Sequence, residues 1–157
     1  MKYKENSVLK DEILENLLNN RMLSNDTEIK NYEYNLELLS ADFSEEDIIE
    51  LCSTFEDRTC NSEIMFSAIH LLETLSSELA YEDTIIGVGN MLNSAPEWAN
   101  IIVYRILNDN ASVQMIKKIY NRLDKNVFDK FKLILEKIEK DDDERFGKII
   151  DELFASF

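Results

Sequence analysis

The sequence predicts an all-α protein, and three observations lead to that fold class. Apolar residues recur at spacings of three and four along most of the 157 residues, which is the periodicity of helices that bury one face. The three glycines and one proline are too few for the many turns of a β-sandwich or barrel. An apolar content of 45% suffices for a core and the length fits one domain, so we expect a single helical domain over residues 1–157.

The apolar spacing divides the chain into eight or nine helices joined by short polar turns. A succession of such elements favours antiparallel helical hairpins, stacked as a short α-solenoid or packed as an irregular bundle. No repeat of fixed period and no linker is evident. The expected helices cover about residues 6–23, 26–39, 44–55, 62–77, 81–92, 94–107, 112–123, 125–140 and 141–154.

The first two helices each show one apolar stripe, as amphipathic helices do. The stripe consists of Val8, Leu9, Ile13, Leu14, Leu17 and Leu18 in the first helix, and of Ile29, Tyr32, Leu36 and Leu39 in the second. The third helix begins at Ser44, an N-cap residue followed by acidic residues, which the positive end of the helix dipole favours. Cys52 lies in its apolar part and is expected to pack as a small hydrophobic residue.

The fourth and sixth helices are apolar almost all the way round, which predicts that both are buried. Between them, the fifth helix contains Gly87 and Gly89, which weaken a helix or allow a neighbouring backbone to approach closely. The sixth is expected to begin in a capping box, because Ser94 is followed three residues later by Glu97. Trp98 comes next, either as a core side chain or as an exposed binding hot spot.

The last three helices are amphipathic and are expected to complete the core. The seventh begins at Ser112, a residue type that caps helices, and the eighth follows Asp124. The ninth opens with the acidic run 141–144, which suits the N-terminus of a helix better than a metal-binding loop.

Three polar residues interrupt the two apolar helices at helical spacing: His70 and Glu73 in the fourth, and Arg105 in the sixth. Because a charge on a buried helix needs a partner, we expect them to form a polar network inside the stack. One interpretation is a structural clamp between the two helices, and Arg105→Ala would then cost about 3–5 kcal/mol of stability. The other is that part of the network lines a groove contacted by a partner.

The chain is strongly acidic, with a formal net charge of −15. Residues 1–57 hold 15 acidic and five basic side chains, so this third of the chain alone carries a net charge of −10. Such a charge argues against nucleic acid and anionic membranes as partners, because both repel it. It permits a basic protein partner, whose opposite potential would speed association. The simpler interpretation is that the acidity only keeps the protein soluble.

The sequence offers no recognisable catalytic, metal or cofactor site. It lacks a Walker loop, a glycine-rich dinucleotide turn and a nucleophile elbow. His70, Cys52 and Cys60 are not spaced as zinc ligands, and His70 with Glu73 reverses the order of di-iron ligands and has no second copy. We therefore expect no enzyme and no cofactor. Two cysteines without a disulfide pattern, together with no apparent signal peptide, favour the cytoplasm.

Five short blocks in the middle of the chain carry a family resemblance. They are Phe55-Glu-Asp-Arg-Thr59, Glu63-Ile-Met-Phe66, His70-Leu-Leu-Glu-Thr74, Ala95-Pro-Glu-Trp-Ala99 and Tyr104-Arg-Ile-Leu-Asn-Asp109. In this order they resemble bacterial polymorphic-toxin immunity proteins of immunity family thirty, over roughly residues 55–119. The resemblance implies an all-α cytoplasmic protein that binds and neutralises a cognate toxin, and it supplies no catalytic residue. Residues before 55 fall outside it.

If the resemblance holds, charge indicates where the toxin binds. A basic toxin surface, such as that of a nuclease, would match the acidic N-terminal third. We expect the contact region at Glu45, Glu46, Asp47, Glu50, Glu56 and Asp57, although the first three also suit a helix N-terminus. Two other functions remain open. One is an α-solenoid scaffold or regulatory adaptor that binds a basic protein, and the other is a small enzyme with a polar pocket.

Overall fold

The computed structural model describes the backbone of residues 2–157 and the side chains of residues 9–157. Within these limits it contains helices and no strand, which confirms the all-α prediction. The α-helices are α1 (Lys2–Asn19), α2 (Asp26–Ser40), α3 (Ile48–Cys52), α4 (Ser62–Leu72), α5 (Glu78–Asn90), α6 (Pro96–Leu107), α7 (Asn110–Ile119), α8 (Lys125–Asp141) and α9 (Asp143–Ser156). Short 3-10 turns are η1 (Glu45–Asp47), η2 (Met91–Asn93) and η3 (Tyr120–Arg122).

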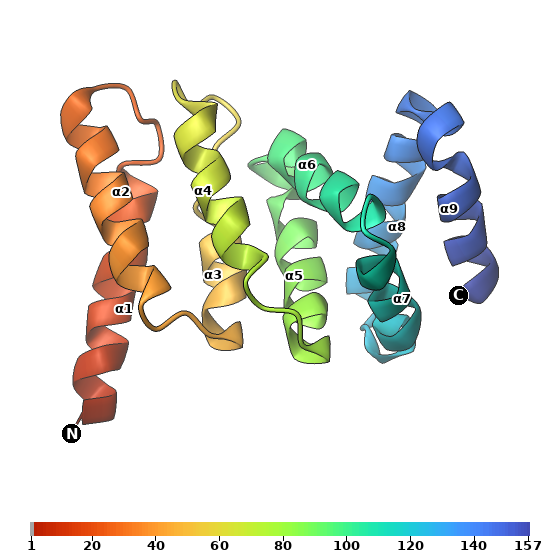
Figure 1. Ribbon diagram of the computed structural model, residues 1–157, viewed down its shortest axis with the longest axis horizontal. Coiled ribbons are helices and arrows are strands. Elements are labelled where there is room, and N and C mark those ends of the chain that lie inside the picture. Colours follow the sequence, from red (N-terminus) through yellow and green to blue (C-terminus); the bar gives the residue numbers. More distant parts are fainter. Residues whose placement is uncertain (1) are drawn as a thin grey trace.

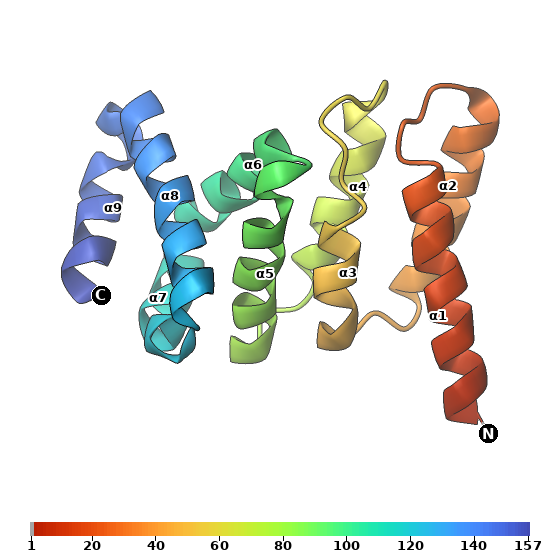
Figure 2. The same ribbon diagram turned by 180° about the vertical axis from the view of Figure 1, so that it is seen from behind.

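The helices stand side by side in a row that follows the order of the chain, as in a short α-solenoid (Figure 1). Two layers form the row. Helices α2 and α4 lie in front of α1 and α3 in Figure 1, and the view from behind in Figure 2 brings α1, α3, α5 and α8 to the front. Helix α6 crosses the row obliquely between α4 and α7. Helix α4 keeps an open face, formed by its exposed residues Ser62, Glu63, Ser67 and His70.

A continuous apolar core runs along the row between the two layers. Phe55, Phe131 and Phe146 are at most 1% exposed, so the core extends from the third helix to the ninth. Trp98 is 4% exposed and packs edge-on against Phe66, with ring centroids 5.1 Å apart. It is therefore a core residue and not an exposed hot spot.

Helices α3 and α5 pack closely against each other in the core, and Gly87 permits it. A Cβ atom on Gly87 would lie 2.6 Å from the Cys52 sulfur and 2.9 Å from the Cys52 Cβ. At Gly89 the corresponding Cβ would lie 3.4 Å from the Lys130 side chain, an ordinary contact. Burial raises the pKa of the Cys52 thiol to about 12, so this cysteine acts as a packing residue.

Several helix ends differ from the prediction because the caps are not the expected residues. Helix α1 ends at Asn19 and not at residue 23, and Leu23 then turns the chain with a φ of 50°. The capping box expected at Ser94 is absent: α6 has Ala95 at its N-cap, with no side-chain bond from that residue. Helix α7 starts two residues before Ser112, because the Asp109 side chain accepts from the Ser112 backbone N–H.

Candidate partner-binding surface

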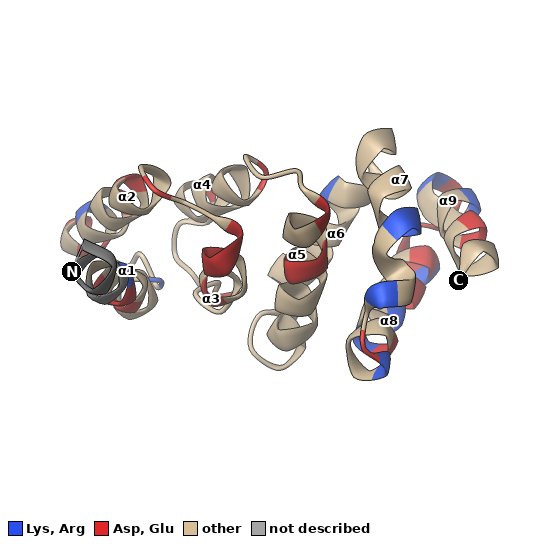
Figure 3. Ribbon diagram, turned by 90° about the horizontal axis from the view of Figure 1, so that it is seen from below, with Lys and Arg blue, Asp and Glu red and all other residues tan. Residues whose placement is uncertain are grey.

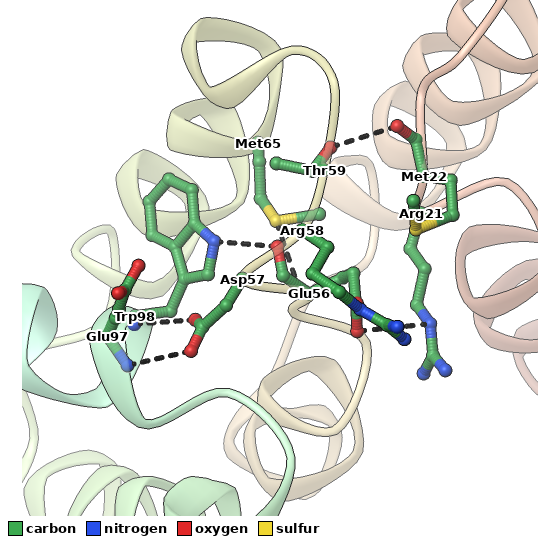
Figure 4. Close-up of polar contacts among 9 residues, drawn as sticks. All are labelled: Arg21, Met22, Glu56, Asp57, Arg58, Thr59, Met65, Glu97 and Trp98. Carbon is green, nitrogen blue, oxygen red and sulfur yellow. Dashed lines mark hydrogen bonds and ion pairs between the residues drawn. The ribbon is translucent and has the colours of Figure 1, made fainter.

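Three of the six acidic residues expected to contact a partner form ion pairs or hydrogen bonds that join separate parts of this chain. The Glu56 side chain is 7% exposed, and its Oε1 accepts a hydrogen bond from Arg58 Nε at 2.8 Å (Figure 4). Arg21 Nε lies 4.0 Å from the other carboxylate oxygen. The bond from Arg58 holds the pKa of Glu56 below its ordinary value, against the effect of burial. Glu56 therefore has a structural role, as the partner of Arg58.

Asp57 is the cap of α6. Its Oδ2 accepts from the backbone N–H of Glu97 at 3.0 Å, and its Oδ1 accepts from the backbone N–H of Trp98 at 3.1 Å (Figure 4). A carboxylate at this position satisfies two free donors and the positive end of the helix dipole. Next to it, the Trp98 indole N–H donates to the Glu56 carbonyl oxygen at 2.9 Å. The loop 53–61 thus joins α6 to the N-terminal half of the row.

Asp47 is also engaged. It is 5% exposed and accepts from Lys10 Nζ and from the Ser44 backbone N–H, each at 3.0 Å. Because Lys10 lies in α1, this ion pair ties the first hairpin to the third helix. Asp47, Glu56 and Asp57 therefore each have an intramolecular partner that joins separate parts of the chain, and their role as contact residues stays a prediction.

Glu45, Glu46 and Glu50 remain at the surface, with Glu46 and Glu50 exposed and Glu45 half-buried. The Glu45 carboxylate accepts from Ser77 Oγ at 2.9 Å, and hydrogen bonds from its own backbone N–H and from Ser77 lower its pKa. Burial raises the pKa of Asp83 on α5, and the negative charges of Glu82 and Glu45 raise it further. The carboxylates of Glu45 on η1 and Asp83 on α5 are therefore close enough for their negative charges to repel each other.

We name Glu45, Glu46, Glu50 and Asp83 the acidic edge. Figure 3 views the whole row from below and shows acidic segments at the start of α3 and on the neighbouring α5. Among the side chains that the structure describes, no cation lies within ion-pair distance of these four carboxylates. Glu78 and Glu82 are excluded from the acidic edge because both pair with Arg122, at 2.8 and 3.3 Å.

The polar network expected inside the stack is a surface ion pair without the histidine. Arg105 Nη2 donates to Glu73 Oε1 at 2.7 Å and Arg105 Nε to Glu73 Oε2 at 3.1 Å, with the side chains 40% and 44% exposed. His70 is exposed on another side of α4. All three residues are exposed, so the prediction of burial is wrong. An exposed pair contributes about 0–1 kcal/mol, far less than the loss expected for Arg105→Ala.

The Glu73–Arg105 pair stands at the mouth of a hollow of about 300 Å³ between α4, α5, α6 and α7, which we name the α4–α7 hollow. Its floor is apolar and is formed by Ile69, Leu72, Ile102 and Ile106. Its rim carries Glu73, Arg105 and Asp109, with Ser76 and Ala111 at the edge.

One wall of the α4–α7 hollow is a chain of hydrogen bonds. Tyr81 Oη lies 2.7 Å from Ser112 Oγ, and Ser112 Oγ donates to Asp109 Oδ2 at 2.6 Å. The Ser112 backbone N–H donates to the same carboxylate oxygen. Sequence reasoning identified Glu73 and Arg105 but missed Tyr81, Asp109 and Ser112. Asp109 and Ser112 resemble an ordinary helix start in the sequence, and nothing in it places them beside Tyr81.

A second hollow, of about 390 Å³, lies on the other side of α4. Leu36 and Leu71 form its apolar part, and Glu33, Glu37 and His70 line it. The open face of α4 is thus flanked by two depressions with apolar floors, and each has two carboxylates in its lining. Concave surfaces of this kind suit a protein partner better than a flat acidic face does.

The described residues show neither a metal cluster nor a membrane span. No group of three or more His, Cys, Asp or Glu side chains is placed to hold a metal ion among them. In the same part of the chain, no helix is long and apolar enough to cross a bilayer.

A family model described as Immunity protein 30 matches residues 19–116, more than half of the chain. The match begins well before residue 55, so the N-terminal limit expected for the resemblance is wrong. It includes the acidic edge and all residues that line the two hollows, and it leaves out α8 and α9. No curated protein and no solved structure matches the chain significantly.

Proposed function

This chain belongs to the immunity protein 30 family, whose members neutralise a toxin by binding it and not by catalysis, and we propose that its partner is a basic bacterial toxin drawn to the acidic edge. The family match carries the general function. The charge of the chain supports the finer assignment, because a net charge of −15 attracts a cationic surface and repels an anionic one.

A nuclease is the toxin class that suits this charge best. An enzyme that cleaves nucleic acid presents cations to the phosphates, and those cations offer a ready target for exposed carboxylates. Glu46 and Glu50 are exposed and have no cation within ion-pair distance among the described side chains, so both are available to such a target. Covering the phosphate-binding surface would block the toxin without any chemistry by the immunity protein.

We propose that the protein acts in the bacterial cytoplasm, as part of a polymorphic-toxin system. Both cysteines, Cys52 and Cys60, are free, which suits a reducing compartment. Protection at low concentrations of both proteins requires tight binding, and a nanomolar dissociation constant corresponds to about −12 kcal/mol.

Rescue of cells tests the function itself. The toxin domain encoded beside this chain's gene is expressed from an inducible promoter, with and without this chain. Survival only in the presence of this chain, together with a stable complex of the two purified proteins, is the expected result. A purified complex without survival would instead indicate an adaptor that binds a basic partner.

Charge neutralisation tests the acidic edge. The triple variant Glu45→Gln, Glu46→Gln, Glu50→Gln should bind the toxin domain with an association rate about tenfold lower at low salt, with weaker salt dependence and a nearly unchanged dissociation rate. The matched control is Glu136→Gln, Glu144→Gln, Glu152→Gln, which removes the same charge from exposed positions of α8 and α9. If both triple variants slow association equally, the total charge of the chain, and not the acidic edge, determines the association rate.

A further inference from the structure

We infer that the α4–α7 hollow is the anchor site for one lysine or arginine side chain of the toxin. The inference rests on the proposed function and adds the place and chemistry of the contact. It differs from the acidic edge, which accelerates the encounter but provides no enclosed site.

The size of the hollow fits a single side chain. Its volume of about 300 Å³ lies at the lower end of the range for small-molecule pockets, roughly 300–1,000 Å³. The floor residues Ile69, Leu72 and Ile106 are 1%, 5% and 8% exposed, so they belong to the packed core. A preformed concave site in a rigid core is where an interface places its strongest contacts.

The rim selects for a cation. Two carboxylates, Glu73 and Asp109, stand against one guanidinium, Arg105, which leaves the rim with a net negative charge. Glu73 uses both of its oxygens on Arg105. Asp109 uses only Oδ2, for the Ser112 backbone N–H and hydroxyl. Its Oδ1 has no hydrogen bond from the side chains that the structure describes, so it can accept one from an incoming ammonium or guanidinium group.

The apolar floor selects for a long side chain. Lysine and arginine bury their methylene stems on apolar surfaces and keep the charged end at the water boundary. In the α4–α7 hollow the stem would cover Ile69, Leu72 and Ile106, and the charged end would reach Asp109 at the rim. A short side chain would leave the apolar floor exposed, and an acidic one would be repelled by the carboxylates of the rim.

The α4–α7 hollow is continuous with the acidic edge. Ser76 lies at the rim of the hollow, and the next residue, Ser77, donates its hydroxyl to Glu45. A basic toxin drawn to the acidic edge therefore arrives beside the hollow. All residues that line the hollow lie between 69 and 112, inside the segment that matches the immunity family.

Two variants of this chain test the anchor. Ala111→Trp places a large side chain at the rim from an exposed position in the first turn of α7. Asp109→Asn removes the charge but keeps a side-chain oxygen for the cap of α7, a position where asparagine is as suitable as aspartate. The matched control is Ala155→Trp, the same change at an exposed position of α9 outside the family match.

The probe is the inactivated toxin domain encoded beside this chain's gene, titrated against each full-length variant by calorimetry. We expect Ala111→Trp to weaken the affinity at least tenfold, Asp109→Asn to weaken it about three- to tenfold, and Ala155→Trp to leave it unchanged. Circular dichroism melts confirm that each variant is folded.

Four outcomes would overturn the inference. Wild-type affinity in both Ala111→Trp and Asp109→Asn excludes the hollow while leaving the proposed function intact. Equal weakening by Ala155→Trp excludes a local effect. A chain that dimerises through the hollow, detected as a dimer by sedimentation and abolished by Ala111→Trp, assigns the site to a second copy of this chain. Failure of the wild-type chain to bind the toxin overturns the proposed function together with the inference.

Discussion

At the scale of single residues, neighbouring acidic side chains have different roles. Glu56 and Asp57 are adjacent in the sequence, yet one holds Arg58 and the other caps α6. Glu50, six residues before Glu56, is exposed. A carboxylate that already has hydrogen-bonding partners contributes to stability, whereas a solvated one remains available for a partner protein.

The pH dependence of stability should distinguish the two kinds. The pKa of Glu56 is lowered in the folded protein, so its stabilising effect is complete above its ordinary value of 4.5 and is lost as the pH falls through the lower folded value. Glu56→Gln should therefore reduce the free energy of unfolding at pH 7 by about 1–2 kcal/mol, since Arg58 is itself solvated. Urea denaturation at pH 7 and pH 3 measures the difference, which should be smaller at pH 3.

The control for that measurement is Glu50→Gln. Glu50 is exposed and should change the stability by no more than about 0.5 kcal/mol at either pH. A loss for Glu56→Gln that persists unchanged at pH 3 would contradict the assignment, because a protonated carboxyl cannot form the ion pair.

At the scale of elements, the two glycines of α5 have different neighbours: Gly87 faces Cys52 of α3, and Gly89 faces Lys130 of α8. Gly87→Ala would force the new methyl group to within 2.6 Å of the Cys52 sulfur, which should destabilise the protein by about 1–3 kcal/mol. Gly89→Ala meets only the flexible Lys130 side chain at 3.4 Å, so the better helix propensity of alanine should stabilise by up to about 1 kcal/mol. Thermal melts of the two variants should shift in opposite directions, and equal shifts would show that helix propensity alone decides.

How well the sequence predicts each element depends on where its cap comes from. Helices α2 and α8 are predicted within one residue at both ends, because their apolar stripes and flanking polar residues are local. The start of α6 is misjudged because its cap, Asp57, lies 40 residues earlier in the chain. The burial of Glu73 and Arg105 is misjudged for a related reason. The sequence shows that both helices are apolar, but it does not show which side of each helix is left exposed to solvent.

At the scale of the whole molecule, the row of helices raises the question of cooperativity. A stack in which each element contacts mainly its neighbours can unfold in parts. Contacts between residues far apart in the chain counter this tendency. The Lys10–Asp47 ion pair joins α1 to η1, and the Cys60 backbone N–H donates to the Met22 carbonyl oxygen at 2.7 Å. Asp57 accepts a hydrogen bond from the backbone of α6. We propose that these contacts make residues 1–157 a single cooperative domain.

Two probes test that proposal. The fluorescence of Trp98 reports on the middle of the row, whereas circular dichroism at 222 nm reports on all helices. Their urea transitions should coincide in midpoint and slope. A helical signal that is lost in a separate, earlier step, before the fluorescence of Trp98 changes, would show that the first hairpin or the last one is an independent unit.

The cap that Asp57 provides has a consequence for how related genes can exchange segments. Asp57 contacts only the main chain of residues 97 and 98, so it places no demand on the side chains found there beyond a free N–H. The joint between the two halves of the row therefore needs the Asp57 carboxylate on one side and, on the other, the Trp98 side chain that donates to the Glu56 carbonyl oxygen. A recombinant that takes its C-terminal half from a relative keeps the joint when the N-terminal parent supplies the carboxylate and the C-terminal parent supplies a tryptophan at position 98. Chimaeras with crossovers between residues 58 and 95 can thus combine the acidic edge of one lineage with the hollow rim at Arg105, Asp109 and Ala111 of another.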